Sequence, residues 1–159
     1  MVAGFISEFP KDADEAWRTR LMNAMDPSPA QLEIIETARR NLLESDFYMD
    51  AQGVGLMLNE AGIPTSAREV NTLREEGYVL AVPDHGVYLY PLFQFDEGGI
   101  PRAIVREVNS AFQGGNEWDI LNWWRQQRPS LSGGSFADNI DQPDIEDRVW
   151  QLLSDLGRR

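Results

Sequence analysis

The stretch SAREVNTLREEGYVLAVPDHGVYLYP, residues 66–91, combines a helical pattern with two short β-type runs. Ser66 and Glu69 have the spacing of a capping box, which predicts that a helix begins there, and Gly77 predicts where it ends. After Gly77, runs of β-branched and aromatic residues flank the Pro-Asp-His-Gly of residues 83–86, whose turn chemistry favours a β-hairpin. This stretch therefore predicts a capped helix followed by a small hairpin.

Another helix is predicted immediately before it. DAQGVGLMLNEAGIP, residues 50–64, has apolar side chains at helical spacing and a stop formed by Gly62 and Pro64. The side chains expected to face inward are Val54, Met57 or Leu58, and Ala61. The predicted order is a helix, a short turn, a capped helix and a hairpin. This is the order of a winged helix-turn-helix, and we expect this module over residues 49–96.

Two amphipathic helices are expected in the N-terminal segment, residues 1–48. The first covers residues 12–25, and the second follows the Pro27-Ser28-Pro29 break. Their expected inward residues are Ala13, Trp17, Leu21 and Ala24 in the first helix, and Leu32, Ile35, Ala38, Leu42 and Leu43 in the second. Together they predict a helical hairpin, which either packs on the rest of the chain or pairs two chains.

The C-terminal segment, residues 97–159, predicts three more helices. One starts at Pro101 and runs to about Phe112, the next runs from Trp118 to Gln126, and the last begins near Pro143. The middle helix has an apolar arc about 200° wide, twice the stripe that a surface helix normally buries. Either one large core covers this arc, or part of it, with the flexible loop 129–137, faces a partner.

The fold class is mainly α with a small β-hairpin.

The composition restricts the possible partners and compartments. The chain carries 26 acidic and 14 basic side chains, a net charge of −12, and no segment is basic. This charge argues against a protein that wraps nucleic acid by bulk electrostatics, and any DNA contact must come from a local patch. The absence of cysteine, of a long apolar run and of a signal-peptide pattern at the N-terminus predicts a cytoplasmic protein without a membrane anchor.

The sequence offers no convincing catalytic or cofactor site. His85 is the only histidine, lies in a turn and has no neighbouring ligand, so we expect neither catalysis nor metal binding there. Ser130, Ser132 and Ser135 lack a partner base. The three Gly-Gly pairs do not have the spacing that cradles phosphates. We expect no enzymatic activity, no metal and no cofactor.

Several motifs resemble known families. Residues 49–96 are similar to the MerR/excisionase-type winged helix, on the matching pieces Ser66 to Gly77 and Tyr90-Pro91. LFQFDEGGIPRAIVREV resembles the P-x-x-Q-F-D connector of some bacterial antitoxins. ILNWWRQQRPSLSGG and the segment after it resemble the toxin-binding domain of the Xre/MbcA/ParS antitoxins. The motif positions there are Trp123-Trp124, Pro129, Leu131 and Gly133-Gly134, whereas Phe136 or Ala137 stands near the usual second proline.

The resemblance implies an antitoxin of a type II toxin–antitoxin system that acts as a homodimer. Its cognate toxin would be of the RES or ParT kind, which acts on NAD or transfers ADP-ribose, and the winged helix would bind operator DNA. The residues implied for DNA binding are Ser66, Arg68, Asn71, Thr72, Arg74, His85 and Tyr88. The residues implied for partner binding are Trp118, Trp123, Arg125, Arg128, Pro129, Leu131, Gly133 and Gly134.

Two other functions compete with the antitoxin interpretation. The predicted recognition helix carries Glu69, Glu75 and Glu76 against Arg68 and Arg74, whereas a groove-facing helix is expected to bring basic or amide side chains to DNA. The chain could therefore be an acidic DNA mimic, or a phage-borne interaction protein without enzymatic activity. A plain transcription regulator is the remaining alternative.

Overall fold

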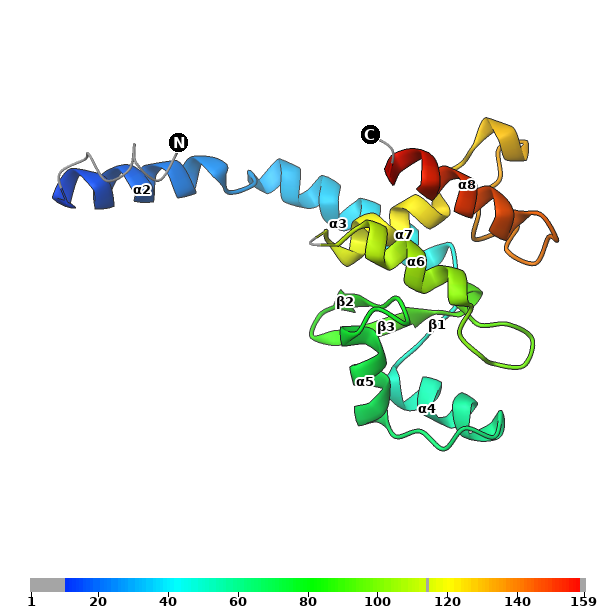
Figure 1. Cartoon of the computed structure of the whole chain (residues 1–159). Helices are drawn as coiled ribbons and strands as arrows, with labels where there is room; N and C mark the ends of the chain where they lie inside the picture. Colours follow the sequence, from blue (N-terminus) through cyan, green and yellow to red (C-terminus); the bar gives the residue numbers. More distant parts are fainter. Residues whose placement is uncertain (1–10, 114, 158–159) are drawn as a thin grey trace. The chain divides into compact units, whose positions relative to one another are not determined.

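The computed structural model describes residues 11–113 and 115–157 and is mainly helical, with one small antiparallel sheet (Figure 1), as the sequence predicts. It divides into two compact units, one up to Arg39 and the other from Arg40 onward. None of the helices in the described ranges is long and apolar enough to cross a membrane.

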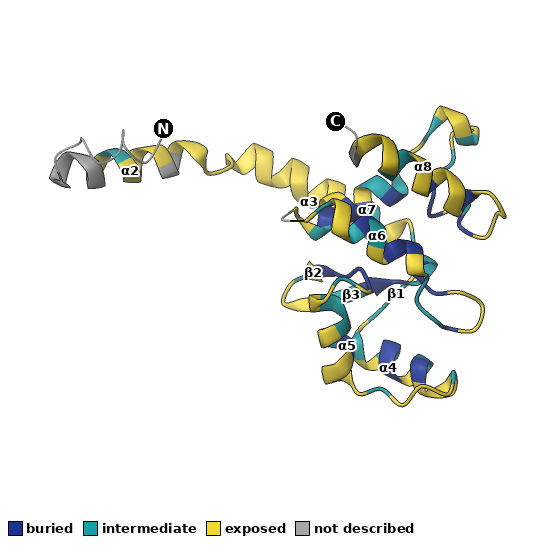
Figure 2. Ribbon diagram, in the orientation of Figure 1, coloured by how far each residue is buried: buried dark blue, intermediate teal, exposed yellow. Residues whose placement is uncertain are grey.

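The first unit consists of helix α2 (Lys11–Met25) and most of helix α3 (Pro29–Glu44), which continues past Arg39. Both helices predicted from the sequence are present. Of the apolar residues expected to face inward, Leu21, Leu32 and Ile35 are exposed, by 41%, 47% and 37%. Leu42 and Leu43, beyond Arg39, are half-buried and pack against the core of the second unit, and the side chain of Ala13 lies outside the described residues. Figure 2 shows α3 almost entirely in the colour of exposed residues. No described side chain of α2 or α3 is buried.

The second unit contains a sheet in the order β1-β3-β2, formed by β1 (Tyr48–Met49), β2 (Val82–Asp84) and β3 (Val87–Pro91). The hairpin predicted from the turn chemistry is confirmed, with Val82 opposite Leu89. His85 and Gly86 form its two-residue turn with φ of 48° and 84°, the positive φ values that such turns require. Strand β1, which pairs Met49 with Tyr90, is too short to leave a pattern in the sequence.

The helix-turn-helix is confirmed. Helix α4 (Ala51–Glu60) is capped by the Asp50 side chain, and α5 (Ala67–Glu75) begins at the predicted capping box of Ser66 and Glu69. A Cβ atom at Gly55 would lie 3.1 Å from the Thr65 carbonyl oxygen, so a glycine lets the turn approach α4 closely. The side chains buried between the helices are Val54, Leu58 and Val70.

The C-terminal part of this unit contains the 3-10 turn η1 (Leu92–Gln94), α6 (Ala103–Ala111), α7 (Glu117–Arg125), the 3-10 turn η2 (Pro129–Leu131) and α8 (Ile145–Gly157). Helix α6 begins two residues later than predicted. Pro101 instead forms an isolated bridge with Phe95, and Arg102 occupies the N-cap position.

The hairpin separates two apolar cores. Along residues 79–82, Val79 and Ala81 belong to the core of the helix-turn-helix, whereas Leu80 and Val82 belong to the core beneath α6, α7 and α8. This alternation is the two-residue period of an extended chain. The boundary predicted between residues 96 and 97 therefore falls inside one compact unit, whose two halves share the same hairpin.

Candidate DNA-binding and partner-binding surfaces

The residues predicted for DNA binding divide into an exposed group and a packed group. The Ser66 hydroxyl caps α5, and Arg68 and Thr72 are exposed on the same helix. The described part of the chain contains no ion pair to Arg68, so its guanidinium is available to a partner. Asn71 is half-buried and accepts a 3.5 Å hydrogen bond from the Tyr90 hydroxyl.

Arg74 and Tyr88 belong to the packed group. The Arg74 guanidinium carbon lies 3.8 Å from the centre of the Tyr88 ring, and the Arg74 side chain is only 19% exposed. Its Nη2 lies 3.8 Å from a Glu75 carboxylate oxygen. The contact between these two residues joins α5 to the β2–β3 hairpin, which is the wing of the winged helix. His85 lies at the wing tip with its side chain 93% exposed and its Nδ1 2.9 Å from the Asp84 carboxylate.

The exposed side of α5 is acidic. Glu69, Glu75 and Glu76 are exposed there, whereas Arg68 is the one exposed arginine of the helix. Phosphate contacts come chiefly from Arg, Lys and neutral polar groups, so this charge weakens any electrostatic attraction to DNA. The resulting surface could position only a few phosphate or base contacts.

The apolar arc of the tryptophan helix is covered by the chain itself. Trp118, Leu121 and Trp124 of α7 are buried, and Trp118 is only 6% exposed. Trp123, expected at the edge of the arc, is half-buried, with its ring centre 5.2 Å from that of Trp124 and 5.3 Å from that of Phe136. One core therefore covers most of the arc; of the two tryptophans predicted to bind a partner, Trp118 is buried and Trp123 is half-buried.

Arg125 is a structural residue in this fold. Its side chain is 9% exposed and lies 2.6 Å from the Asp46 carboxylate and 2.5 Å from the Asp138 carboxylate. It also donates a 2.6 Å hydrogen bond to the Ser45 carbonyl oxygen. Burial raises the pKa of Asp46 despite this neighbour. The cluster ties the start of the unit to α7 and to the loop after it, and leaves little of Arg125 for a partner.

The loop expected to be flexible is held by hydrogen bonds. The Arg128 amide donates to the Gly134 carbonyl at 2.9 Å, and the Gly133 amide donates back to the Arg128 carbonyl at 3.1 Å. Further along, the Ala137 amide donates to the Trp124 carbonyl at 3.0 Å, and Phe136 and Ala137 are buried. Apolar side chains at the positions near the expected second proline therefore anchor the loop to the core.

The outer part of this loop offers the most accessible of the predicted partner-binding residues. Pro129 and Gly133 are exposed, and Leu131 and Gly134 are half-buried. The Arg128 guanidinium carbon lies 4.3 Å from the centre of the Phe136 ring and 4.9 Å from that of Trp123. Burial lowers the pKa of Arg128. We name residues 128–134 the docking loop.

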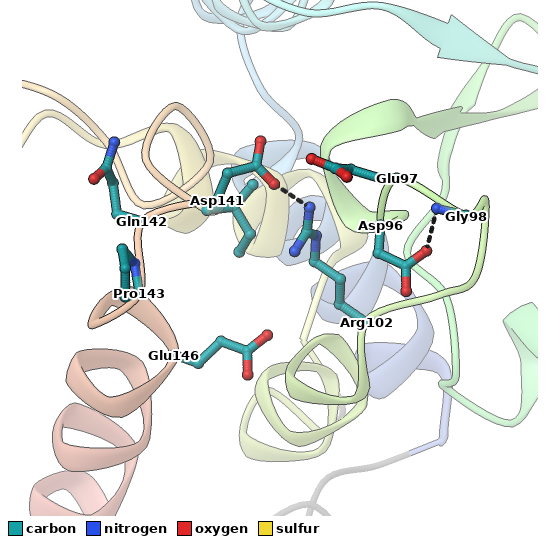
Figure 3. Close-up of a pocket in the computed structure, with 9 residues that line it drawn as sticks. Asp96, Glu97, Gly98, Arg102, Asp141, Gln142, Pro143 and Glu146 are labelled. Carbon is teal, nitrogen blue, oxygen red and sulfur yellow. Dashed lines mark hydrogen bonds and ion pairs between the residues drawn. The ribbon is translucent and has the colours of Figure 1, made fainter.

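A polar pocket of about 490 Å³ lies between the start of α6 and the segment before α8 (Figure 3). Arg102 projects into it and lies 2.5 Å from the Asp141 carboxylate, while Asp96 accepts a hydrogen bond from the Gly98 amide. Sequence reasoning missed this pair because its members are 39 residues apart. Nowhere in the described residues do three or more His, Cys, Asp or Glu side chains gather in a way that could hold a metal ion.

Comparison with known proteins identifies a fold but no family. Neither a family model nor a curated protein matches the chain. The structure is similar to the NMR structure of Rv2175c, with a TM-score of 0.57 and 19% sequence identity, over 69% of this chain and 80% of that chain. At this level of identity the similarity concerns the fold alone.

Proposed function

We propose that this protein is an antitoxin-type regulator that neutralises a cognate toxin by direct binding through the docking loop. The observation that carries the proposal is the construction of this loop. Hydrogen bonds close its backbone, and Arg128 lies over the rings of Trp123 and Phe136. A preordered loop loses little conformational entropy on binding, and an arginine beside aromatic residues is typical of interface hot spots.

The charge of the chain suits this function better than it suits DNA binding. An acidic protein with a net charge of −12 attracts a basic partner and repels nucleic acid. The resemblance of residues 120–156 to the Xre/MbcA/ParS toxin-binding domain suggests a partner of the RES or ParT kind. We assign the chain a binding role and no catalytic step.

Operator binding by the winged helix is a second proposed function, supported by one specific observation. Arg68 lies exposed on α5, in the first turns after the capped N-terminus, where recognition helices approach the groove. With the acidic residues around it, this module would bind DNA weakly as a single copy and would gain affinity from the pairing of two copies.

Co-expression with the product of the neighbouring reading frame tests the main function. We expect that product to arrest growth when it is expressed alone, and we expect the full-length wild-type chain to restore growth and to co-purify with it in a fixed ratio. Pro129→Glu places a charge on the exposed docking loop and should abolish both effects. Arg68→Glu, an exposed change on α5, is the control and should leave both intact.

Three results would contradict the proposal. One is a neighbouring product that causes no growth arrest and forms no complex with the chain. Another is a complex that survives Pro129→Glu unchanged, because the docking loop would then lie outside the interface. The third is a loss of binding by Pro129→Glu accompanied by a large loss of thermal stability, which would show that the loop is structural only.

A further inference from the structure

The two N-terminal helices carry a stripe of exposed apolar residues on one face. Leu21, Met25, Leu32 and Ile35 are exposed, with Met25 reaching 72%. They recur at the three- and four-residue spacing of a helix face that packs against another helix. Isolated helices of 15 or 16 residues are marginal in water, and packing of the apolar face normally stabilises them.

The charge of the N-terminal helices favours a second copy of this chain over a basic partner. Residues 11–44 hold five basic and seven acidic side chains, so this segment is nearly balanced in a strongly acidic chain. A basic partner would gain little from such a surface. Two copies, by contrast, would meet here without the repulsion that the rest of the chain imposes.

The order of the charges along α3 sets the orientation of the pair. At 100° per residue, Glu33, Glu36 and Arg40 lie on one flank of the stripe. The acidic residues come first and Arg40 comes last. In an antiparallel pair with two-fold symmetry, this flank faces the same flank of the other copy in reverse order, so that Glu33 of each copy meets Arg40 of the other.

We propose that two copies of this chain associate through an antiparallel pairing of α3. The symmetric register that places Ile35 of one copy against Ala38 of the other also places Glu33 opposite Arg40. The pairing would join two winged helices into one regulator, independently of whether the docking loop binds a toxin.

The oligomeric state of the full-length protein tests the pairing. Light scattering coupled to size-exclusion chromatography should give a dimer at about 50 μM, and Leu32→Glu with Ile35→Glu should give a monomer. Ile34→Glu is the matched control. Ile34 is 69% exposed and points away from the stripe on the same helix, so this variant should remain dimeric. Unchanged thermal melting of the double variant would show that the fold from Arg40 onward is intact.

Cysteine cross-linking tests the orientation, because the chain contains no cysteine of its own. A mixture of the Ile35→Cys and the Ala38→Cys proteins should give a disulfide-linked dimer in air. Leu32→Cys alone should not, because the two cysteines would lie about 13 Å apart along the helix axis, whereas a disulfide requires Cα atoms within about 7 Å.

The alternatives give different results. A monomeric wild-type protein would overturn the proposal, as would a dimer unaffected by Leu32→Glu with Ile35→Glu, or one lost equally with Ile34→Glu. Efficient cross-linking of Leu32→Cys would overturn the antiparallel orientation. A dimer that fails to bind the neighbouring product would leave this pairing intact while contradicting the proposed function.

Discussion

The side-chain amide of Gln94 forms two hydrogen bonds with the backbone of Leu80. Gln94 accepts from the Leu80 amide at 2.7 Å through Oε1 and donates to the Leu80 carbonyl at 2.8 Å through Nε2. A third bond joins Nε2 to the Pro91 carbonyl at 2.9 Å. Gln94 is fully buried and thereby completes the hydrogen bonding of the segment that leads into the hairpin. Gln94 of the Q-F-D connector therefore has a structural role in this fold.

Gln94→Ala should destabilise the fold by about 2–4 kcal/mol, because it leaves three buried backbone groups without partners. Denaturant unfolding monitored by circular dichroism measures the loss. Gln52→Ala, on the exposed side of α4, should change stability by less than about 0.5 kcal/mol. Equal stability of the two variants would show that water replaces the Gln94 amide.

The free energy of unfolding of the Asp46→Asn variant should rise relative to that of the wild type as the pH increases from about 3 to about 6. Burial raises the pKa of Asp46 in the folded state, so its protonated form favours folding at low pH and the wild-type protein loses that stability as the carboxyl ionises. Asparagine has no such ionisation. Urea unfolding of both proteins across this range measures the difference in the free energy of unfolding. A difference that shrinks with rising pH would mean that Arg125 outweighs the desolvation of Asp46.

Trp124→Ala should cost about 3–5 kcal/mol of folding stability, as truncations of buried aromatic residues do. Trp124 is fully buried. Trp123 contacts Phe112, Phe136 and Arg128, so Trp123→Ala should also destabilise, by about 2–3 kcal/mol, since it is half-buried. Trp150, 46% exposed on α8, is the control, and Trp150→Ala should cost less than about 1 kcal/mol. If Trp123→Ala leaves the melting temperature unchanged, Trp123 is not needed for the core and is again a candidate for partner binding.

Arg68→Ala should weaken binding to the DNA upstream of the gene and reduce the salt dependence, since an exposed phosphate contact would be lost. Fluorescence anisotropy at several salt concentrations measures both effects. Arg74→Ala should mainly lower thermal stability, because Arg74 packs on Tyr88. If no upstream sequence binds the wild-type protein even at low salt, the winged helix serves as scaffold alone.

The sequence by itself determined the elements whose signals are local. Capping at Ser66, the positive-φ turn at Gly86 and the apolar period of α7 all act within a few residues, so the helix-turn-helix, the hairpin and the tryptophan helix could be predicted. Backbone hydrogen bonds and side-chain periodicity set these features before any distant contact forms.

Only the tertiary structure decided which candidate residues remain at the surface. Arg125 reaches Ser45 from 80 residues away, and Gln94 reaches Leu80 across the hairpin, so neither role leaves a local pattern. The same holds for Phe136, which packs on Trp123 and anchors a loop that glycines and serines had suggested to be flexible. Periodicity shows that a face is apolar, whereas the element that covers the face depends on how distant segments pack.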